Sequence, residues 1–109
     1  MKKAIVILSV VLLTSCSAKL AMPTQSDADR GSAKFSGLTV AQLEEGRALF
    51  KSKCTQCHPA KKPSSRDEVK WREIVPKMAE KAHRKGKEEI SSTDQEKILK
   101  YLITMSRNA

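Results

Sequence analysis

Apolar side chains recur at helical spacing in three stretches of this 109-residue chain. The pattern predicts one helix over residues 38–53, a second that begins after Ser65, and a last helix that begins after Ser91. Thr39 and Ser91 are suitable caps, and Ser65 with Glu68 three residues later has the sequence of a capping box. No stretch alternates polar and apolar residues as a strand does. The predicted fold class is therefore all-α, with three to four helices.

Two residues interrupt the helical pattern, and a polar segment ends the second helix. Gly46 in mid-helix costs about 1 kcal/mol relative to Ala, which predicts that another helix approaches closely there. Pro76 removes a backbone hydrogen bond and should kink or restart the second helix. The apolar face of that helix comprises Val69, Trp71, Ile74, Val75, Met78 and Ala82. Residues 83–89 are polar and include Gly86, so we expect a loop before the last helix.

The first fifteen residues have the features of a targeting segment. Lys2 and Lys3 precede an apolar stretch, residues 4–13, that is too short to span a bilayer. Leu13-Thr14-Ser15-Cys16 resembles the lipobox of bacterial lipoproteins, which implies a signal peptide over residues 1–15, cleavage before Cys16 and a lipid on its sulfur. Position 17 is Ser, whereas an Asp there would resemble an inner-membrane retention signal. Its absence favours sorting to the outer membrane. The alternative is an ordinary signal peptide without a lipid.

Residues 16–37 are rich in small and polar residues and show no apolar periodicity. This composition predicts a flexible tether between the membrane and a folded domain over residues 38–109. The alternative is an ordered extension wrapped on the domain, with Phe35 and Leu38 docked. Met22 in this segment is interpreted as a bystander.

The charge and the size of the chain restrict its partners and its core. The formal charge is +9, and loss of the leader lysines leaves +7. A positive surface suits an acidic protein partner, although a merely soluble, lysine-rich surface is an equal alternative. Nucleic acid is not expected, because the chain is exported. Only four aromatic residues are present, and so small a core favours folding around a cofactor.

The most specific chemistry lies in Cys54-Thr55-Gln56-Cys57-His58, the C-x-x-C-H attachment sequence for a c-type haem. Two thiols three positions apart are about one helical turn apart, so Cys54 and Cys57 can both form thioethers with one porphyrin. His58 then supplies the proximal imidazole to the iron. The alternatives are a thioredoxin-like dithiol, which needs a βαβ setting, and half of a zinc site, which needs further ligands. A lipid on Cys16 and haem on the other two cysteines would use all three thiols.

Residues 38–106 resemble class I cytochrome c, in its short bacterial form with one haem. Gly46, Phe50, Tyr101 and Leu102 match positions where the first and last helices of that family cross. The run from Trp71 to Met78 resembles the family's W-x-x-x-V-x-x-M segment. The resemblance implies one covalent haem c, with Met78 as the distal iron ligand and Trp71 lining the pocket. It also implies that a proline carbonyl, from Pro63 or Pro59, orients His58.

Other residues compete for some of these roles. His83 is the alternative distal ligand, and Met105 is interpreted as packing in the last helix. The lysines that flank the motif, expected to form a docking rim or simply a solvated surface, are Lys51, Lys53, Lys61 and Lys62.

The expected function is that of a monomeric, lipid-anchored electron carrier in the bacterial periplasm, exchanging single electrons with a redox protein. No acid–base pair or nucleophile pattern indicates an enzyme. The alternatives are a haem-based sensor of small ligands and the electron-entry subunit of a larger oxidoreductase.

Overall fold

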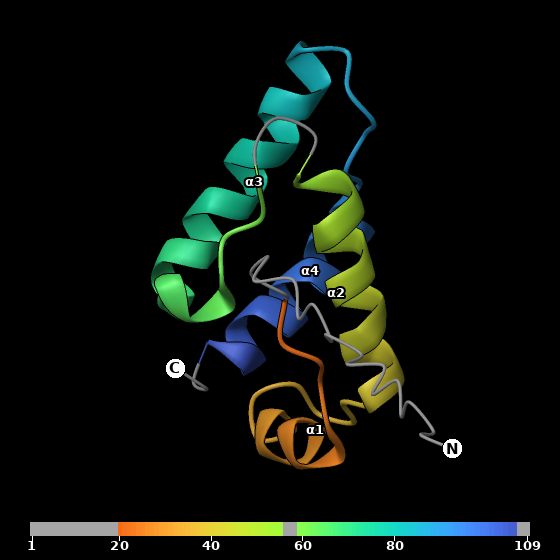
Figure 1. Cartoon of the computed structure of the whole chain (residues 1–109), viewed down its shortest axis with the longest axis vertical. Helices are drawn as coiled ribbons and strands as arrows, with labels where there is room; N and C mark the ends of the chain where they lie inside the picture. The colour runs from red at the N-terminus through yellow and green to blue at the C-terminus, as the bar shows by residue number, and fades with distance from the viewer. Residues whose placement is uncertain (1–19, 56–58, 107–109) are drawn as a thin grey trace, which may run out of the picture.

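The computed structural model describes residues 20–55 and 59–106, which form four α-helices and one short 3-10 helix without a strand (Figure 1). The elements are α1 Gln25–Gly31, α2 Val40–Lys53, η1 Pro63–Ser65, α3 Glu68–Arg84 and α4 Ser92–Met105. The all-α prediction is confirmed for these ranges. None of the helices in them combines the length and the apolar character needed to cross a membrane.

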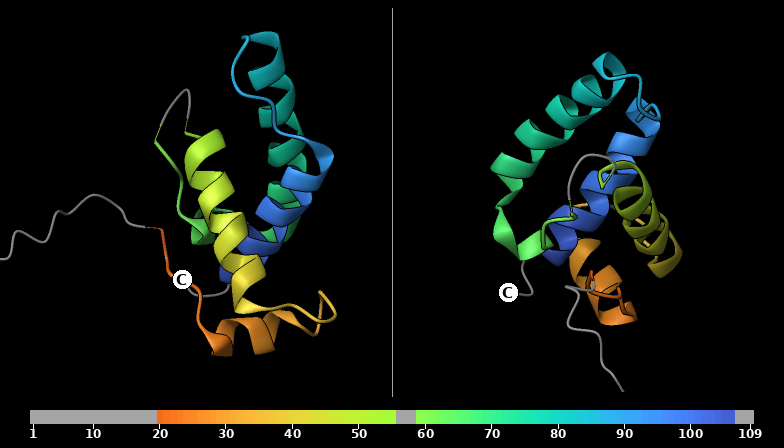
Figure 2. Two further views of the ribbon diagram at one scale, coloured as in Figure 1. Left: turned by 90° about the vertical axis from the view of Figure 1, so that its right-hand side faces the viewer. Right: turned by 45° about the horizontal axis from the view of Figure 1, so that its top comes forward.

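Helix α4 is the centre of the fold. The helices α1, α2 and α3 and the short η1 all pack on it, whereas the backbones of α2 and α3 do not pack on each other. Figures 1 and 2 show α2 and α3 on either side of α4. Ile98, Tyr101 and Leu102 are each 0 % exposed. Burial of such side chains is worth about 1.5–3 kcal/mol apiece, and α4 supplies six of the seventeen buried apolar side chains in the described ranges, more than any other element.

Gly46 marks the closest approach between α2 and α4. A Cβ at this position would overlap the carbonyl oxygen of Lys97 and would lie 2.9 Å from the Cβ of Tyr101. Any side chain larger than hydrogen would therefore push the two helices apart. The predicted close helix contact at Gly46 is confirmed, with Phe50 and Tyr101 both buried beside it.

Two of the three predicted helix caps are confirmed. The Thr39 side chain accepts a hydrogen bond from the backbone N–H of Gln42, and that of Ser91 from Asp94. The prediction for Ser65 is wrong, because Asp67 caps α3 by accepting from the N–H of Lys70 at 2.8 Å.

Ser65 instead closes η1, where its hydroxyl donates to the carbonyl of Lys62 at 2.6 Å. Val69, in the first turn of α3, is 76 % exposed. Its assignment to the apolar face of the second predicted helix is therefore also wrong.

The second half of α3 runs further than expected. The helix continues through Pro76 without a second start and ends at Arg84, so the loop begins at Lys85 rather than at residue 83. Gly86 has φ +65, a left-handed conformation that glycine adopts without the cost other residues incur. Its N–H donates to the carbonyl of His83 at 3.2 Å and closes the turn.

The N-terminal segment is folded, and the prediction of a flexible tether is wrong for residues 20–37. Helix α1 has a capping box between Thr24 and Asp27, and the segment packs on both α2 and α4. Leu38 is buried and Phe35 is half-buried, as the ordered alternative requires. The few buried apolar residues of the segment are too widely spaced in the sequence to give a helical periodicity. The folded unit therefore includes residues 20–37 and does not begin at Leu38.

Candidate functional site

A cavity of about 190 Å³ lies between α2 and α3, at the end of α2 that precedes the C-x-x-C-H sequence. It opens where the two helices, each packed on α4, do not contact each other through their backbones. Its lining combines the end of α2, the face of α3 and the segment that joins them, and consists of Phe50, Cys54, Ala60, Lys61, Arg66, Trp71, Ile74 and Met78. The lining is mostly apolar, which suits a flat apolar group with a polar edge.

Cys54 is the C-cap residue of α2 and contributes its thiol to this cavity. Its backbone N–H donates to the carbonyl of Phe50 at 3.0 Å, and the residue is 5 % exposed. Burial raises the pKa of the Cys54 thiol to about 12, because an apolar environment disfavours the thiolate. Cys57 and His58, the other residues of the predicted attachment sequence, lie outside the described residues, as does Cys16.

Trp71 forms one wall of the cavity. Its ring meets that of Phe50 edge to face, with 5.9 Å between centroids and 82° between planes. The indole N–H donates to the carbonyl of Pro63 at 2.9 Å. Trp71 is 1 % exposed, so this bond satisfies a donor that would otherwise be buried without a partner. The same Pro63 carbonyl was one of two predicted partners for His58.

The two candidate distal ligands, Met78 and His83, occupy different places, and Met105 lies apart from both. Met78 is half-buried and lines the cavity together with Cys54. The His83 side chain is 72 % exposed, does not line the cavity, and lies 2.8 Å from Glu89 through Nδ1 and Oε1. Met105 is 3 % exposed within the core, as expected for a packing residue. The structure thus brings Met78, and not His83, to the cavity of Cys54.

The predicted lysine rim is divided by the structure. Lys51, Lys61 and Lys62 are exposed, whereas the Lys53 side chain is 16 % exposed and is bonded to Asp94. Its ammonium also donates to the carbonyl of Glu89 at 2.8 Å. Lys53 therefore joins the end of α2 to the start of α4 and is not a docking lysine.

Arg66 and Lys61 are the cationic residues of the cavity lining. Arg66 was not predicted as a site residue, because no motif surrounds it in the sequence. Its side chain donates through Nη1 to the carbonyl of Ser65 at 2.8 Å. A positive edge on an otherwise apolar cavity favours a ligand that carries negative groups at one end.

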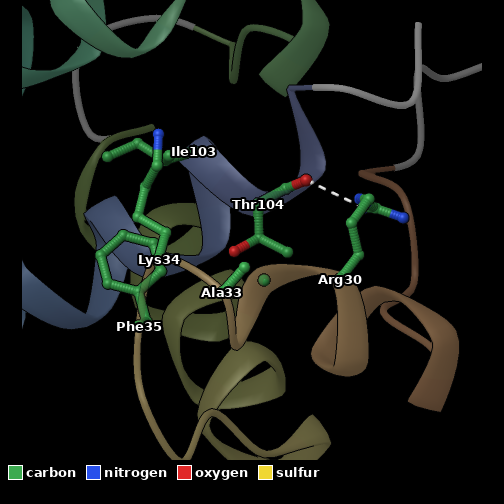
Figure 3. A pocket seen from close by; sticks show the side chains of 7 residues that line it. Arg30, Ala33, Lys34, Phe35, Ile103 and Thr104 are labelled. Atoms are coloured by element: carbon green, nitrogen blue, oxygen red, sulfur yellow. Dashed lines mark hydrogen bonds between the residues drawn. The ribbon is translucent and has the colours of Figure 1, made fainter.

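A second hollow, of about 400 Å³, lies between the segment after α1 and the end of α4 (Figure 3). Arg30, Lys34 and Phe35 face Ile103 and Thr104 across it. Among all the described residues, no group of three or more His, Cys, Asp or Glu side chains could hold a metal ion.

No protein-family profile, curated protein or solved structure matches this chain.

Proposed function

We propose that this protein is a monohaem c-type cytochrome that transfers single electrons and is attached by Cys16 to a membrane facing the periplasm. The observation that supports this most is that Cys54 and Met78 line the same apolar cavity. One supplies a thiol of the attachment sequence, and the other supplies a thioether, a known axial ligand of electron-transfer haem.

The described residues fit a haem in three respects. The cavity lies between two helices whose backbones are separated, which suits a flat cofactor inserted between them. Phe50, Trp71 and Ile74 give it apolar walls. Lys61 and Arg66 stand at the cavity as cations that can pair with the two propionates. In this proposal Cys54 and Cys57 hold the group covalently, and His58 and Met78 are the axial ligands.

The chain's own residues would act by excluding water and fixing geometry. When bound, the haem supplies a ferric–ferrous couple that accepts and releases one electron. The Trp71–Pro63 hydrogen bond fixes the indole, and the contact between Phe50 and Trp71 fixes the cavity wall. A rigid, largely apolar pocket lowers the reorganisation that accompanies each change of charge. Ligation of the haem iron by the Met78 thioether would favour the ferrous state and raise the reduction potential.

The first test is covalent attachment and axial ligation. The mature protein, produced with haem-maturation machinery, should have the mass of the chain plus one haem. The oxidised protein should show the weak long-wavelength band of thioether-to-iron ligation. That band should vanish in Met78→Ala and survive in His83→Ala. Met22→Ala, at a side chain that is 60 % exposed, is the matched methionine control and should leave the spectrum unchanged.

The outcomes separate the proposal from its alternatives. Absence of a covalent haem mass would refute the cytochrome assignment altogether. Loss of the band in His83→Ala, with retention in Met78→Ala, would refute the assignment of Met78. Rapid binding of carbon monoxide by the reduced wild-type protein would indicate an open iron site and favour a ligand sensor over a carrier.

A further inference from the structure

The first described residues are fixed to the body of the protein by hydrogen bonds from two helices. Arg47 on α2 donates through Nε and Nη2 to the carbonyl of Leu20, each at 3.2 Å. Tyr101 on α4, which is 0 % exposed, donates its hydroxyl to the carbonyl of Ala21 at 2.8 Å. Leu20 itself is 6 % exposed and belongs to the same apolar core as Phe50 and Cys54. The described chain is therefore held to the body of the protein from Leu20 onward.

The chain that follows Ala21 is also fixed to the body of the protein. Thr24 and Asp27 form a reciprocal capping box at the start of α1. Arg30 near the end of α1 donates through Nη2 to the carbonyl of Thr104 at 3.0 Å (Figure 3). Residues 20–31 are thus bound to α2 and α4 along their length and do not provide a tether.

The remaining covalent distance to the proposed lipid anchor is short. Only three residues, 17–19, lie between Cys16 and Leu20, and the four Cα-to-Cα steps from Cys16 to Leu20 span at most about 14 Å. A tether of the 22 residues 16–37, as the sequence suggested, would instead span a mean distance of about 25 Å and a much larger maximum. The folded start at Leu20 removes most of this reach.

We infer that the protein is held close to the bilayer that carries its own anchor, with the side on which the described chain starts facing the lipid surface. This inference depends on the lipidation of Cys16 in the proposed function. The occupant of this face is the lipid surface itself, because the short chain keeps Leu20 within about 14 Å of the lipid that Cys16 would carry.

The arrangement of the chain gives the orientation. In the left view of Figure 2, the orange start of the described chain and the green segment that leads into η1 lie on the same side of α2. That green segment contains Ala60 and Lys61, which line the candidate haem cavity. The start of the described chain and the segment that lines the cavity therefore lie on the same side of α2.

The chemistry of this side suits a lipid surface. Met22, two residues from Leu20, is 60 % exposed and is one of the two large apolar side chains exposed in the described ranges. An apolar side chain beside an anchor can enter the interfacial layer. The mature chain as proposed carries a net charge of +7, which attracts the protein as a whole to anionic lipids by about 1 kcal/mol for each basic residue that comes near the surface.

Neutron reflectometry on a supported bilayer of mixed zwitterionic and anionic lipids tests the inference with the lipidated holoprotein. The wild-type protein should lie no more than about 14 Å from the headgroups. A 20-residue Gly/Ser insertion between Lys19 and Leu20 should thicken the intervening water layer toward about 25 Å. A wild-type layer already thicker than the short chain permits, or no change on insertion, would overturn the inference.

Release of the docked segment gives a second arm. The double variant Arg47→Met, Tyr101→Phe removes both sets of hydrogen bonds to Leu20 and Ala21, and it should widen the gap by up to about 14 Å. Arg72→Met, at an exposed arginine of α3, makes the same change of charge without touching the segment and should leave the gap unchanged. An equal gap in both variants would overturn the role of the docked segment.

Failure of the lipid anchor can be distinguished from failure of the docking. Mass spectrometry of the N-terminus reports whether Cys16 carries acyl chains. Their absence would refute the proposed anchoring and, with it, the inference that the protein is held at the bilayer. The docking is then still measurable on the unacylated protein by tryptic cleavage after Arg30. Cleavage should be slow in the wild type and several-fold faster in the double variant. Equal rates would show that residues 20–31 are not held.

Discussion

Cys54 shows how one residue changes its chemistry when the chain folds. In the sequence it is one of the two cysteines of the predicted haem attachment motif, and thiols react as thiolates. In the folded protein it is 5 % exposed with a pKa raised to about 12 by burial. Such a thiol is a poor nucleophile at neutral pH. The folded, haem-free chain is therefore expected to protect the residue whose reaction the proposed function requires.

Alkylation of the haem-free protein measures this protection. In a variant with Cys16→Ser and Cys57→Ser, reaction of Cys54 with iodoacetamide at pH 8 should be about a hundredfold slower in buffer than in urea. The thiolate population falls with a pKa raised from about 8.5, and the higher nucleophilicity of a more basic thiolate offsets part of that loss.

The thiol introduced by Ser52→Cys, in a chain that also carries Cys54→Ser, is the matched control. Position 52 is exposed on the same helix, so its rate should be similar in both solvents. An equally fast reaction of Cys54 in buffer would contradict the burial described for it.

At the scale of the elements, the contact between α2 and α4 depends on Gly46. Gly46→Ala should lower the free energy of unfolding by about 3 kcal/mol, because the added methyl group would meet the Lys97 carbonyl, which is backbone and cannot rotate away. Urea unfolding followed by circular dichroism measures the loss. Glu44→Ala, at an exposed position of the same helix, should change stability by less than about 0.5 kcal/mol. Equal midpoints for the two variants would contradict the close contact.

The ion pair between Lys53 and Asp94 joins the same two helices and gives a dependence on pH. The hydrogen bond from Lys53 holds the pKa of Asp94 below its usual value, although burial opposes the effect. Because the folded pKa is below the unfolded one, the pair stabilises the protein above about pH 4. This stabilisation is lost as the pH falls through the folded pKa of Asp94.

Asp94→Asn should therefore have a lower midpoint of urea unfolding than the wild type at pH 7, and the difference should shrink as the pH falls below about 4. Glu96→Gln, an exposed carboxylate in the same helix, removes the same charge without the ion pair. A difference between Asp94→Asn and the wild type that persists unchanged into acid would show that the charge of Asp94 is not its cause.

The sequence predicted the elements whose signals are local. Thr39 and Ser91 cap their helices within four residues, and Gly46 is conspicuous because glycine is costly inside a helix. The choice of Asp67 over Ser65 could not be predicted, because both are good caps and only the formation of η1 engages Ser65 elsewhere. The site was partly predictable: Met78 and Trp71 were expected there from the resemblance to class I cytochrome c, whereas Arg66 reaches the cavity through tertiary structure alone.

At the scale of the whole molecule, the N-terminal segment completes the fold. A chain that begins at Leu38 should be less stable than one that begins at Lys19 by about 3 kcal/mol or more. It loses the burial of Leu20 and Ala28 on the body, and the buried Tyr101 hydroxyl loses its acceptor. Thermal unfolding of the two chains measures the difference. Equal stability of the two truncated chains would mean that residues 20–37 contribute nothing to the fold.

The position of α4 in the sequence has a consequence in time. Every other described element packs on α4, yet α4 is the last of them along the chain. Chains are synthesised from the N-terminus, so α1, α2 and α3 emerge before the helix that supports them. Until α4 arrives, nothing holds α2 and α3 on either side of the cavity. The order of synthesis thus leaves an interval in which Cys54 is still exposed to solvent, and the arrival of the last helix closes it.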